Sequence, residues 1–447
     1  MQTDVLVVGG SAAGIVAATT AKSHYQDKKV TMLRKEEKVL VPCGIPYIFG
    51  TLGESNKNII PDAVVTDKGV DIVLNEAISV DFEKKECICK DGEIIAYEKI
   101  IFATGSVPRV PTWLKGADLE GVYTVAKDKA YLDNFYENIK NVDDIVVIGG
   151  GFIGVEISDE LKKQGKNVTI IEVLPYVLGA VFDENVANKA EEVLKSRGVS
   201  LKCGSGIKSI NGDAKAKSVT LENGDEIKAD AVILAMGYTP NNTLALSCGL
   251  ELNKFSQINV DEYMRTSVKD VFATGDCASK RDFITGKTIS TMLASIACYE
   301  GKVAGSNLYG VNKLKNAMGI VSMFSTAIGD DVFASVGYTK MSADNEGLDS
   351  VHVEFTNIDK HPANLPNAKP LSVELVVMKN SGAIIGGTIS GGVSVGELVN
   401  ALGIAIQTKT TVQSLSMMQV ATHPLLTSSP VAHPLIKAAE MAYLKLG

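Results

Sequence analysis

The chain of 447 residues carries 44 Lys and Arg against 52 Asp and Glu, which gives a formal net charge of −8. Hydrophobic residues make up 45% and charged residues 21%, the balance of a folded globular protein and not of a collagen, a coiled coil or a disulfide scaffold. At about 150 residues per domain, the length predicts two to four domains. The basic residues are scattered, so nucleic acid is not an expected partner.

The apolar runs and the cysteines exclude further classes. Runs such as Val5 to Val8 are far shorter than the roughly 18 to 20 residues that cross a bilayer, so no membrane segment is expected. The N-terminus enters a strand without a basic leader or signal core, which favours a cytoplasmic location. The seven cysteines are widely spaced, with no CxxC pair and no Cys/His cluster for a metal. We therefore expect a reducing compartment, in which a special cysteine acts as a thiol.

The chain opens with a strand, a glycine turn and a helix. Val5–Val8 is a buried-strand pattern, and the turn carries Gly9, Ser11 and Gly14 in the spacing G-x-G-x-x-G, with Ser11 at the middle position. Such a turn binds a pyrophosphate because its backbone approaches closely and the N–H groups of the helix N-terminus face the anion. The first segment therefore predicts dinucleotide binding.

The next strand departs from the usual pattern. An acidic residue is expected at its end, because a carboxylate accepts both ribose hydroxyl protons. Here residues 30–33 are followed by Arg34 and Lys35, and only then by Glu36 and Glu37. Two interpretations stay open: the acid is displaced, or the basic residues contact the adenosine.

Further along, a strand over residues 94–103 ends in Thr104 and Gly105, and the prolines of 108–111 suit a crossover between domains near residue 112. A second strand, turn and helix then follow, with Gly149, Gly151 and Gly154 in full agreement with the pattern.

The second unit has its acid in place. Residues 168–172 end in Glu172, and Val173 and Leu174 follow, so no basic residue is present to bind a 2′-phosphate. The sequence therefore predicts NADH in preference to NADPH.

Two more buried strands end in glycine turns, at Gly237 and at Gly275-Asp276, and the chain returns to its first domain near residue 241. After Gly319 the pattern becomes α+β. Strands are expected over 332–336, 350–355 and 371–378, a hairpin-like turn over 382–387, and helices over 395–406 and 433–444.

In this order, the two glycine turns, Thr104-Gly105, Gly237–Asn241 and Thr274–Asp276 resemble the pyridine nucleotide-disulfide oxidoreductases, which bind FAD and NAD(P)H. The resemblance covers essentially the whole chain. It implies an α/β protein with two Rossmann-like dinucleotide-binding domains, for FAD and for NAD, and a C-terminal α+β dimerisation domain. The implied boundaries are 1–112 and 241–319 for FAD, 113–240 for NAD and 320–447 for dimerisation, in a homodimer.

The segment Val41–Tyr47, with Cys43, looks like the single-cysteine branch of that family, which includes coenzyme A-disulfide reductases, NADH oxidases, NADH peroxidases and NADH-dependent polysulfide or persulfide reductases. Cys43 precedes Gly44–Pro46, which we expect to start a helix whose dipole lowers the pKa of the thiol. Tyr47 either assists the Cys43 thiol in its reaction or only packs against neighbouring side chains. The other six cysteines are predicted to be packing residues, with Cys87 and Cys89 on one face of a strand.

The resemblance also implies cofactor contacts. Those residues are Gly9, Ser11, Ala12, Ala13, Gly14, Arg34, Lys35, Pro42, Ala77, Ala103, Thr104, Gly105, Gly149, Gly151, Phe152, Ile153, Gly154, Glu156, Glu172, Gly237, Asp276, Leu293 and Ala294. Among them, Phe152 stands where the family often has a Tyr that shields the flavin and swings aside for the nicotinamide. Glu156 lies near both rings by the same analogy, or is an ordinary charged residue of a helix.

The segment around His423-Pro424 is similar to the one by which two-cysteine members bring a base across the dimer interface, although Ser428 stands in place of the following Glu. His423 is either a general acid near Cys43 of the other subunit or a structural residue. His433 is the less favoured candidate.

The function predicted from these residues is an FAD-dependent, NADH-consuming reduction of sulfur–sulfur bonds. The substrate is a persulfide, a polysulfide or coenzyme A disulfide, with coenzyme A as substrate or bound ligand. The alternatives are an NADH oxidase that reduces oxygen and a slow flavin redox sensor. Ala12 favours sulfur, because the peroxidases and many oxidases carry a histidine there.

Overall fold

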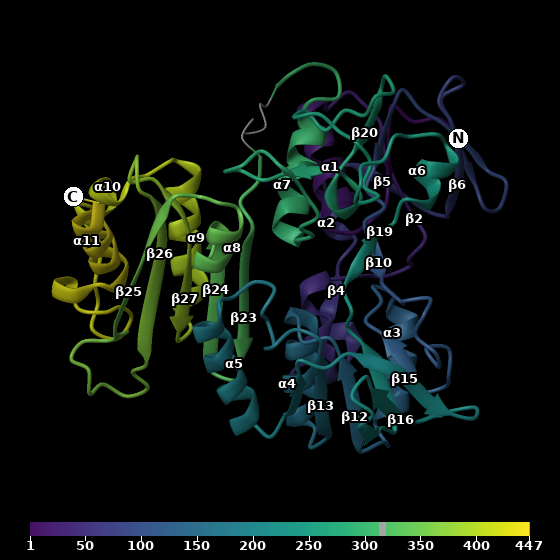
Figure 1. Ribbon diagram of the computed structural model, residues 1–447. Coiled ribbons are helices and arrows are strands. Elements are labelled where there is room, and N and C mark those ends of the chain that lie inside the picture. The colour runs from purple at the N-terminus through teal and green to yellow at the C-terminus, as the bar shows by residue number, and fades with distance from the viewer. Residues whose placement is uncertain (313–318, 447) are drawn as a thin grey trace. The chain divides into compact units, whose positions relative to one another are not determined.

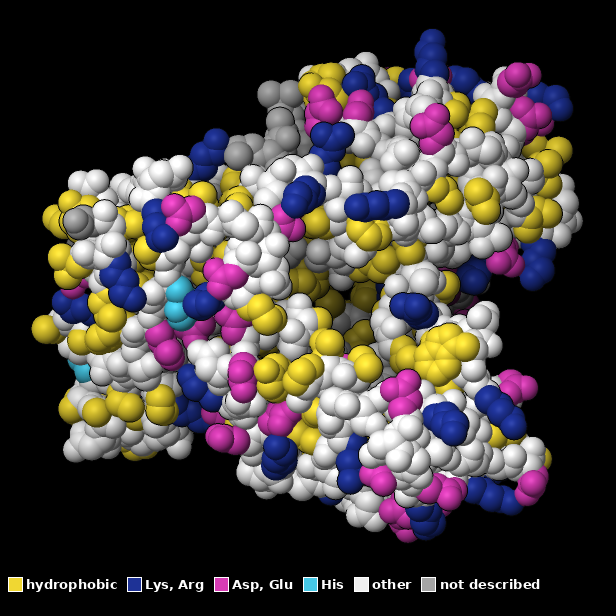
Figure 2. Space-filling model, viewed as in Figure 1, with side chains coloured by type: hydrophobic (Ala, Val, Ile, Leu, Met, Phe, Trp, Pro, Cys, Tyr) yellow, Lys and Arg dark blue, Asp and Glu magenta, His cyan; other side chains and the backbone are white. Residues whose placement is uncertain are grey.

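The computed structural model describes residues 1–312 and 319–446. The chain divides into two compact units. Unit 1 comprises residues 1–113, 121–142 and 236–320, and unit 2 comprises residues 114–120, 143–235 and 321–447. On the face seen in Figure 2, basic and acidic side chains are interspersed. Over the part of the chain that the structure describes, no helix is both long and apolar enough to cross a membrane.

Unit 1 is built on a parallel sheet. Its strands, in order across the sheet, are β20 (Val271–Ala273), β9 (Lys99–Phe102), β1 (Val5–Val8), β2 (Val30–Arg34) and β5 (Val70–Leu74). All four residues of β1 are buried, as expected for a central strand that is covered on both faces. The carboxyl ends of β1, β9 and β20 therefore meet at one edge of the sheet.

Two helices of unit 1, α1 (Ala12–His24) and α7 (Ala294–Ser306), pack side by side (Figure 1). Glycines in α7 allow this approach, because a Cβ on Gly305 would lie 2.4 Å from the carbonyl oxygen of Ala17. A Cβ on Gly275 would likewise lie 2.7 Å from the Cβ of Ala13. The N-terminus of α1 and the turn after β20 are thus held together.

The strand expected over residues 94–103 is two strands in different sheets, β8 (Ile94–Ala96) and β9. The chain turns between them because the N–H groups of Tyr97 and Glu98 donate to the carbonyls of Lys85 and Asp4. The remaining elements of unit 1 are β3 (Val39–Leu40), β4 (Ile59–Ile60), α2 (Ala63–Thr66), β6 (Ala77–Asp81), β7 (Glu86–Cys89), β10 (Ser106–Pro108), β11 (Val122–Thr124), α3 (Lys129–Ile139), β19 (Tyr238–Pro240), α6 (Thr243–Ser247), β21 (Lys280–Arg281) and β22 (Thr288–Ile289).

Unit 2 contains a second parallel arrangement and an antiparallel sheet. The parallel strands run in the order β18 (Ala231–Leu234), β12 (Asp144–Ile148), β13 (Asn167–Glu172) and β14 (Ser200–Cys203). Helix α4 (Phe152–Lys163) follows β12, and α5 (Glu184–Ser196) follows β13. A small antiparallel sheet is formed by β15 (Ile207–Gly212), β16 (Ala216–Leu221) and β17 (Glu226–Lys228).

The C-terminal part of unit 2 is an antiparallel sheet with helices. Its strand order is β23 (Met323–Ile328), β24 (Asp331–Gly337), β27 (Ile384–Gly391), β26 (Pro370–Met378) and β25 (Ser350–Ile358). Helix α9 (Val395–Gln407) packs on β24 and β27, and α11 (Pro434–Leu446) packs on β25 and β26. Two short helices, α8 (Lys340–Asn345) and α10 (Val412–Ser416), complete it. The predicted fold class is confirmed.

The hairpin-like turn predicted over 382–387 is only partly right. The turn ends at Ala383, and Ile384 to Gly387 belong to the buried strand β27. The glycines there serve close approach, since a Cβ on Gly386 would lie 1.9 Å from the carbonyl oxygen of Tyr338. Strand β23 was not predicted.

Candidate active site

The first glycine turn leaves the backbone at the start of α1 uncovered by side chains. Gly9 has φ +116°, and a Cβ there would lie 2.1 Å from the carbonyl oxygen of Ala103. A Cβ on Gly14 would lie 1.9 Å from the carbonyl oxygen of Gly9. Ser11 precedes the helix, and its side chain makes no capping hydrogen bond. The first N–H groups of α1, from Ala12 and Ala13, are thus left for an anion such as a pyrophosphate.

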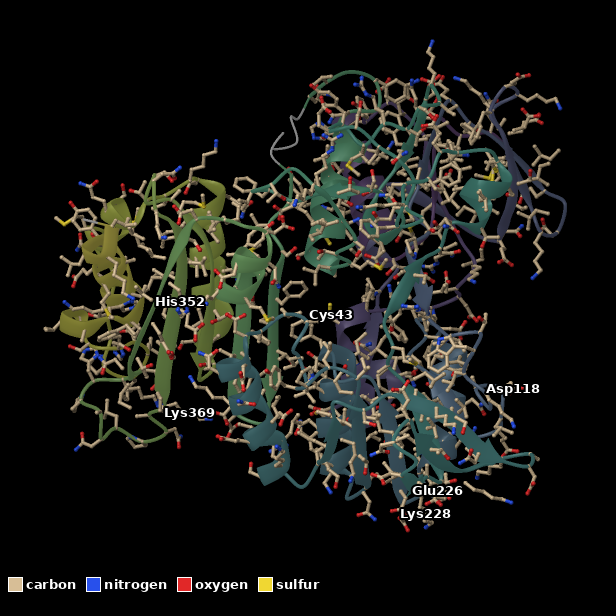
Figure 3. All side chains as sticks on the ribbon, viewed as in Figure 1. Cys43, Asp118, Glu226, Lys228, His352 and Lys369 are labelled. Atoms are coloured by element: carbon tan, nitrogen blue, oxygen red, sulfur yellow. The ribbon has the colours of Figure 1, made fainter. Side chains whose placement is uncertain are left out.

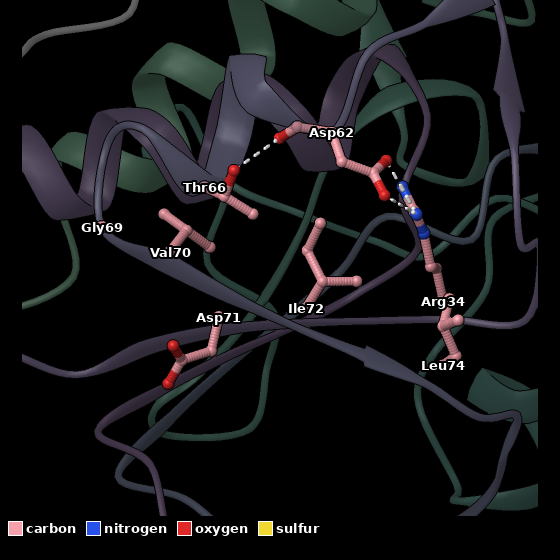
Figure 4. Close-up of a pocket in the computed structure, with 8 residues that line it drawn as sticks. All are labelled: Arg34, Asp62, Thr66, Gly69, Val70, Asp71, Ile72 and Leu74. Atoms are coloured by element: carbon pink, nitrogen blue, oxygen red, sulfur yellow. Dashed lines mark hydrogen bonds and ion pairs between the residues drawn. The ribbon is translucent and has the colours of Figure 1, made fainter.

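Arg34 occupies the place where an acid is usual, and it is paired inside the protein. Its Nη2 lies 2.8 Å from Oδ1 of Asp62 (Figure 4). The same nitrogen donates to the carbonyl of Glu37 at 3.1 Å. The side chain is buried under Gly10, where a Cβ would lie 2.7 Å from Cδ of Arg34. Lys35, by contrast, is exposed. Of the two basic residues, only Lys35 extends into solvent.

Arg34 also lines a pocket of about 450 Å³ beside β5. The other lining residues are Asp62, Thr66, Gly69, Val70, Asp71, Ile72 and Leu74 (Figure 4). The Nε atom of Arg34 is buried and makes no hydrogen bond to the described protein atoms.

Asp276 is anchored at the carboxyl edge of the unit 1 sheet. Its Oδ2 accepts hydrogen bonds from Oγ of Ser106 at 2.6 Å and from Nζ of Lys127 at 3.2 Å. Burial alone would raise the pKa of Asp276, but Lys127, Ser106 and Lys280 together hold it below its ordinary value. Asp276 is therefore a fixed carboxylate at neutral pH.

A buried ion pair fixes the turn that carries Asp276. Lys280 and Glu300 are fully buried, with Nζ 3.4 Å from Oε2. Oε2 of Glu300 accepts the N–H of Gly275 at 3.0 Å, and Nζ of Lys280 donates to the carbonyls of Gly275 and Ala278 at 2.6 and 2.8 Å. Sequence reasoning missed this pair. The one available signal was Glu300 itself, an acid that lies among the alanines and glycines of α7.

The neighbouring loops are tied together by backbone contacts. Oγ1 of Thr104 donates to the carbonyl of Asn241 at 2.6 Å, and the N–H of Asn241 donates to the carbonyl of Gly105. Leu293 is the residue before α7 and Ala294 is its first residue, while Ala77 begins β6. Ala103, Thr104, Leu293 and Ala294 thus sit at strand or helix ends, where their backbone groups can reach a ligand.

Cys43 is exposed and lies in a short 3₁₀ turn, Pro42–Gly44 (Figure 3). A second 3₁₀ turn, Pro46–Phe49, follows it. The expected α-helix is absent from this segment, because Pro46 has no N–H to continue a helix. Lowering of the thiol pKa by an α-helix dipole therefore finds no support.

The Cys43 turn is pinned by Asn58, which sequence reasoning missed. Nδ2 of Asn58 donates to the carbonyl of Val41 at 3.0 Å, and the carbonyl of Asn58 accepts the N–H of Val41 at 2.9 Å. A Cβ on Gly44 would lie 2.0 Å from Oδ1 of Asn58. Asn58 is 5% exposed. The thiol thus projects from a rigid support. Tyr47 is half-buried in the next turn.

The second glycine turn repeats the first. Gly149 has φ +111°, and a Cβ on Gly154 would lie 1.9 Å from the carbonyl oxygen of Gly149. Gly151 precedes α4 without a side-chain cap, and a Cβ there would meet no atom within 4 Å. The N–H groups at the start of α4, from Phe152 and Ile153, therefore face open space, as a nucleotide requires.

Glu172 is held against this turn. Its Oε2 accepts the N–H of Gly150 at 2.6 Å, and its Oε1 accepts the N–H of Leu174 at 2.8 Å. Each carboxylate oxygen has further lone pairs for ribose hydroxyls. Gly237, with φ +87°, follows β18 and is exposed.

Phe152 and Glu156 project from α4 toward β23. The ring of Phe152 stacks on Phe324 at a centroid distance of 5.4 Å and meets the edge of Phe182 at 6.2 Å. Oε1 of Glu156 accepts a hydrogen bond from Oγ1 of Thr326 at 2.9 Å. Burial raises the pKa of Glu156 to about 7, although the Thr326 hydroxyl works against this rise. A carboxyl in this state titrates near neutral pH.

His423 is exposed, and the backbone orients it. Its Nδ1 accepts the N–H of Leu425 at 3.2 Å, so the neutral ring carries its proton on Nε2. Ser428 does not replace the missing carboxylate, because it is buried and donates to the carbonyl of Ile358 at 2.6 Å. His433 is buried, and burial lowers its pKa.

Other thiols differ from Cys43 in exposure. Cys87 and Cys89 share the buried face of β7, as predicted. Burial raises the pKa of Cys87 and of Cys203 to about 12 and raises that of Cys277 as well. Such thiols are poor nucleophiles.

Comparisons with known proteins agree with this geometry. Residues 3–301 match the family model described as pyridine nucleotide-disulphide oxidoreductase, and residues 323–433 match the dimerisation domain of that family. The chain belongs to the pyridine nucleotide-disulphide oxidoreductases. It is thus an oxidoreductase, and its family implies FAD and NAD(P)H as cofactors.

Three similar proteins are named either as an NADH oxidase or as a reductase of persulfides or polysulfides. An NADH oxidase from Methanocaldococcus jannaschii is 30% identical over 99% of both chains. An NAD(P)H coenzyme A polysulfide/persulfide reductase from Pyrococcus horikoshii is 33% identical over 88% of both chains. The solved structure of an NAD-dependent persulfide reductase from A. fulgidus has a TM-score of 0.92 and 30% identity, covering all of this chain and 83% of that one.

Proposed function

We propose that this chain is an NADH-dependent flavoprotein reductase of small sulfur–sulfur bonds in persulfides, polysulfides or coenzyme A disulfide. The observation that carries the proposal is Cys43, an exposed thiol on a turn that Asn58 holds rigid. The relatives named as persulfide and polysulfide reductases support the same substrate class.

The residues present fit both cofactors. Gly9, Gly14 and Asp276 would hold FAD, and the buried Oγ1 of Thr274, beside Asp276, makes no hydrogen bond within the described protein. The open N-terminus of α4 and Glu172 would hold NADH. When bound, NADH supplies a hydride and FAD passes the two electrons on to sulfur.

The chain's own residues would carry out the sulfur chemistry. The Cys43 thiolate attacks one sulfur of the substrate, a bond forms between the two sulfurs, and the original sulfur–sulfur bond breaks. His423 of the partner subunit, after taking up a proton from solvent, gives a proton from Nε2 to the leaving thiolate and returns to the neutral ring. Two electrons then split the mixed disulfide and restore the Cys43 thiolate. In sum, one NADH and one proton convert each sulfur–sulfur bond into two thiols.

Two further residues would shape nucleotide binding. Phe152 would act as a ring gate over the nicotinamide site, and ionised Glu156 can accept a hydrogen bond from the carboxamide of the nicotinamide. Glu172, followed by Val173 and Leu174, would repel a 2′-phosphate, so we expect NADH to be preferred over NADPH.

A homodimer is part of the proposal. The C-terminal domain matches a dimerisation domain and leaves large apolar side chains uncovered. Among them, Val393 is 89% exposed, Met417 84% and Val431 80%. A second copy would cover such residues.

The test is an anaerobic comparison of oxidants with purified holoenzyme that has been reduced by NADH. We expect a persulfide, polysulfide or coenzyme A disulfide to reoxidise it, and Cys43→Ser to slow this reaction by about 1,000-fold or more. Cys248→Ser is the matched control, since that half-buried thiol accepts the N–H of Val80 and contacts the hydroxyl of Ser247. A Cys43→Ser variant that reduced sulfur substrates at the parental rate would contradict the proposal.

The second candidate function is an NADH oxidase, favoured by the name of the Methanocaldococcus jannaschii relative. Ala12 argues against a dedicated oxygen reaction, because its methyl group cannot donate a proton to a reduced oxygen species. Rapid turnover of oxygen, with slow turnover of every sulfur substrate, would establish this second function instead. An enzyme that turned over both classes slowly would fit a redox sensor.

A further inference from the structure

Strand β23, at the start of the C-terminal domain, faces the helix of the second glycine turn. Phe324 and Thr326 are two residues apart on the strand and therefore share a face. Phe152 and Glu156 are four residues apart on α4 and share a face of that helix. Each strand residue contacts one helix residue.

The ring contact fixes Phe152. The planes of Phe152 and Phe324 differ by 16°, and Phe182 makes a T-shaped contact with Phe152 at an interplanar angle of 79°. Phe152 and Phe324 are half-buried, and Phe182 is 1% exposed. A ring that moves to admit a nicotinamide must break the stack on Phe324 first, so this stack opposes binding.

The hydroxyl contact fixes Glu156. Thr326 is 4% exposed, and its Oγ1 donates to the carboxyl group. Strand β23 has no titratable side chain, and the charged group that acts on Glu156 is Glu160, one turn along the same helix. Thr326 therefore stabilises the ionised form of a carboxyl whose surroundings disfavour charge.

We propose that β23 positions the nicotinamide end of the NADH site, with Phe324 holding the gate ring and Thr326 holding the Glu156 carboxylate. This inference rests on the proposed function for Phe152 and Glu156. It assigns to the C-terminal domain a part in NADH binding that is separate from dimerisation. Phe324 and Thr326 are positioning residues, since each acts through a residue of α4.

The first experiment measures the Kd for NADH against pH from anaerobic stopped-flow reduction of the flavin. In the parent, NADH binding weakens as pH falls through about 7, where Glu156 takes up a proton. Thr326→Val removes the hydroxyl and raises the pKa of Glu156, so we expect the midpoint to lie about 0.5 to 1 pH unit higher.

Thr388→Val is the matched control. Thr388 is also buried in the same sheet and donates to a buried carboxyl, Oε2 of Glu374, at 2.7 Å. A loss of one buried hydroxyl is thus common to both variants, and only Thr326→Val should move the midpoint. Equal midpoints in the parent and Thr326→Val would overturn the role of Thr326.

The second experiment removes the stack. In Phe324→Ala the Phe152 ring leaves its place more easily, so the Kd for NADH at pH 8 should fall about threefold to tenfold. Phe355→Ala, which removes a half-buried ring from β25 of the same sheet, should leave it unchanged. An unchanged or raised Kd in Phe324→Ala would overturn the role of Phe324.

Two more variants separate this inference from the proposed function. If Glu156→Gln keeps the parental pH dependence of NADH binding, the role of Glu156 itself is wrong. If Glu156→Gln abolishes that dependence while Thr326→Val leaves it in place, the proposed function stands and the positioning by Thr326 fails. Phe152→Ala serves the same purpose for the gate, because Phe324→Ala should have no further effect on NADH binding in that background.

Discussion

At the scale of single residues, Asp276 shows how a partner sets the charge of a buried carboxyl. Its pKa is held low because Lys127 and its other partners outweigh burial. The stabilisation from a lowered pKa is present above the ordinary value near 4 and is lost as pH falls through the folded value. Asp276 therefore stabilises unit 1 throughout the neutral range.

Without Lys127, ionised Asp276 should destabilise unit 1 at neutral pH instead of stabilising it. In Lys127→Met the burial of Asp276 gains weight and its pKa rises, so the variant should lose roughly 1 to 3 kcal/mol of unfolding free energy at pH 7. The loss should shrink as pH falls toward 5, where the carboxyl is protonated more readily. Urea unfolding at both pH values measures it.

Lys129→Met provides the control, because Lys129 pairs with the half-exposed Asp133 one turn along α3. Such helix-surface pairs contribute about 0.5 kcal/mol or less. A loss in Lys127→Met that is the same at pH 7 and pH 5 would contradict the assignment.

At the level of single residues, the sequence predicts the positions that belong to a local motif. It does not predict residues whose role depends on a tertiary contact. Gly9, Gly14, Gly149 and Gly154 could be found because their spacing is tied to one turn. Lys127, Asn58 and Thr326 could not, since each acts on a residue far from it in the chain. The segment after Cys43 was misjudged because Gly-Ile-Pro permits both a helix start and a 3₁₀ turn.

At the scale of elements, the contact between α1 and α7 sets the position of the first glycine turn. Gly305→Ala would place a methyl group 2.4 Å from the carbonyl oxygen of Ala17 and push the helices apart. We expect a loss of about 1 to 3 kcal/mol of unfolding free energy, with FAD released at lower urea concentration. Flavin fluorescence reports the release.

Gly396→Ala in α9 is the matched helical control, because a Cβ there would meet no atom within 4 Å. Alanine favours a helix over glycine by up to about 1 kcal/mol, so this variant should be as stable as the parent or more stable. Equal FAD release in Gly305→Ala and the parent would show that the helix contact tolerates a methyl group.

Elements with a strong local pattern were predicted well, as β1 and β12 show. In each strand four consecutive apolar residues run directly into a glycine turn, and a buried parallel strand suits that pattern. Strand β23 is not predicted because Ser325 and Thr326 interrupt its apolar run, and residues 384–387 of β27 are predicted as part of a turn because of their glycines. In both cases, pairing with neighbouring strands determines that the segment is a strand.

At the scale of the whole molecule, the proposed mechanism joins Cys43 of one subunit to His423 of the other. A heterodimer of Cys43→Ser and His423→Gln subunits would then contain one site with both defects and one intact site. We expect it to reduce sulfur substrates at about half the parental rate, although each homodimer is slow. Differently tagged subunits allow the heterodimer to be isolated and assayed anaerobically.

If His423 served Cys43 of its own subunit, every site of that heterodimer would carry one defect, and no activity would return. Flavin reduction by NADH should stay at the parental rate in His423→Gln, which separates a role in the sulfur step from a folding defect.

The buried pair of Lys280 and Glu300 has a consequence for how the flavin is held. Both charges bind the backbone of the Gly275 turn, so the protein's own side chains hold that loop in place without a ligand. Binding then costs little conformational entropy, because no segment has to be ordered. The affinity for FAD should accordingly appear as a slow dissociation rate, and the apoprotein should recombine with FAD without a preceding folding phase.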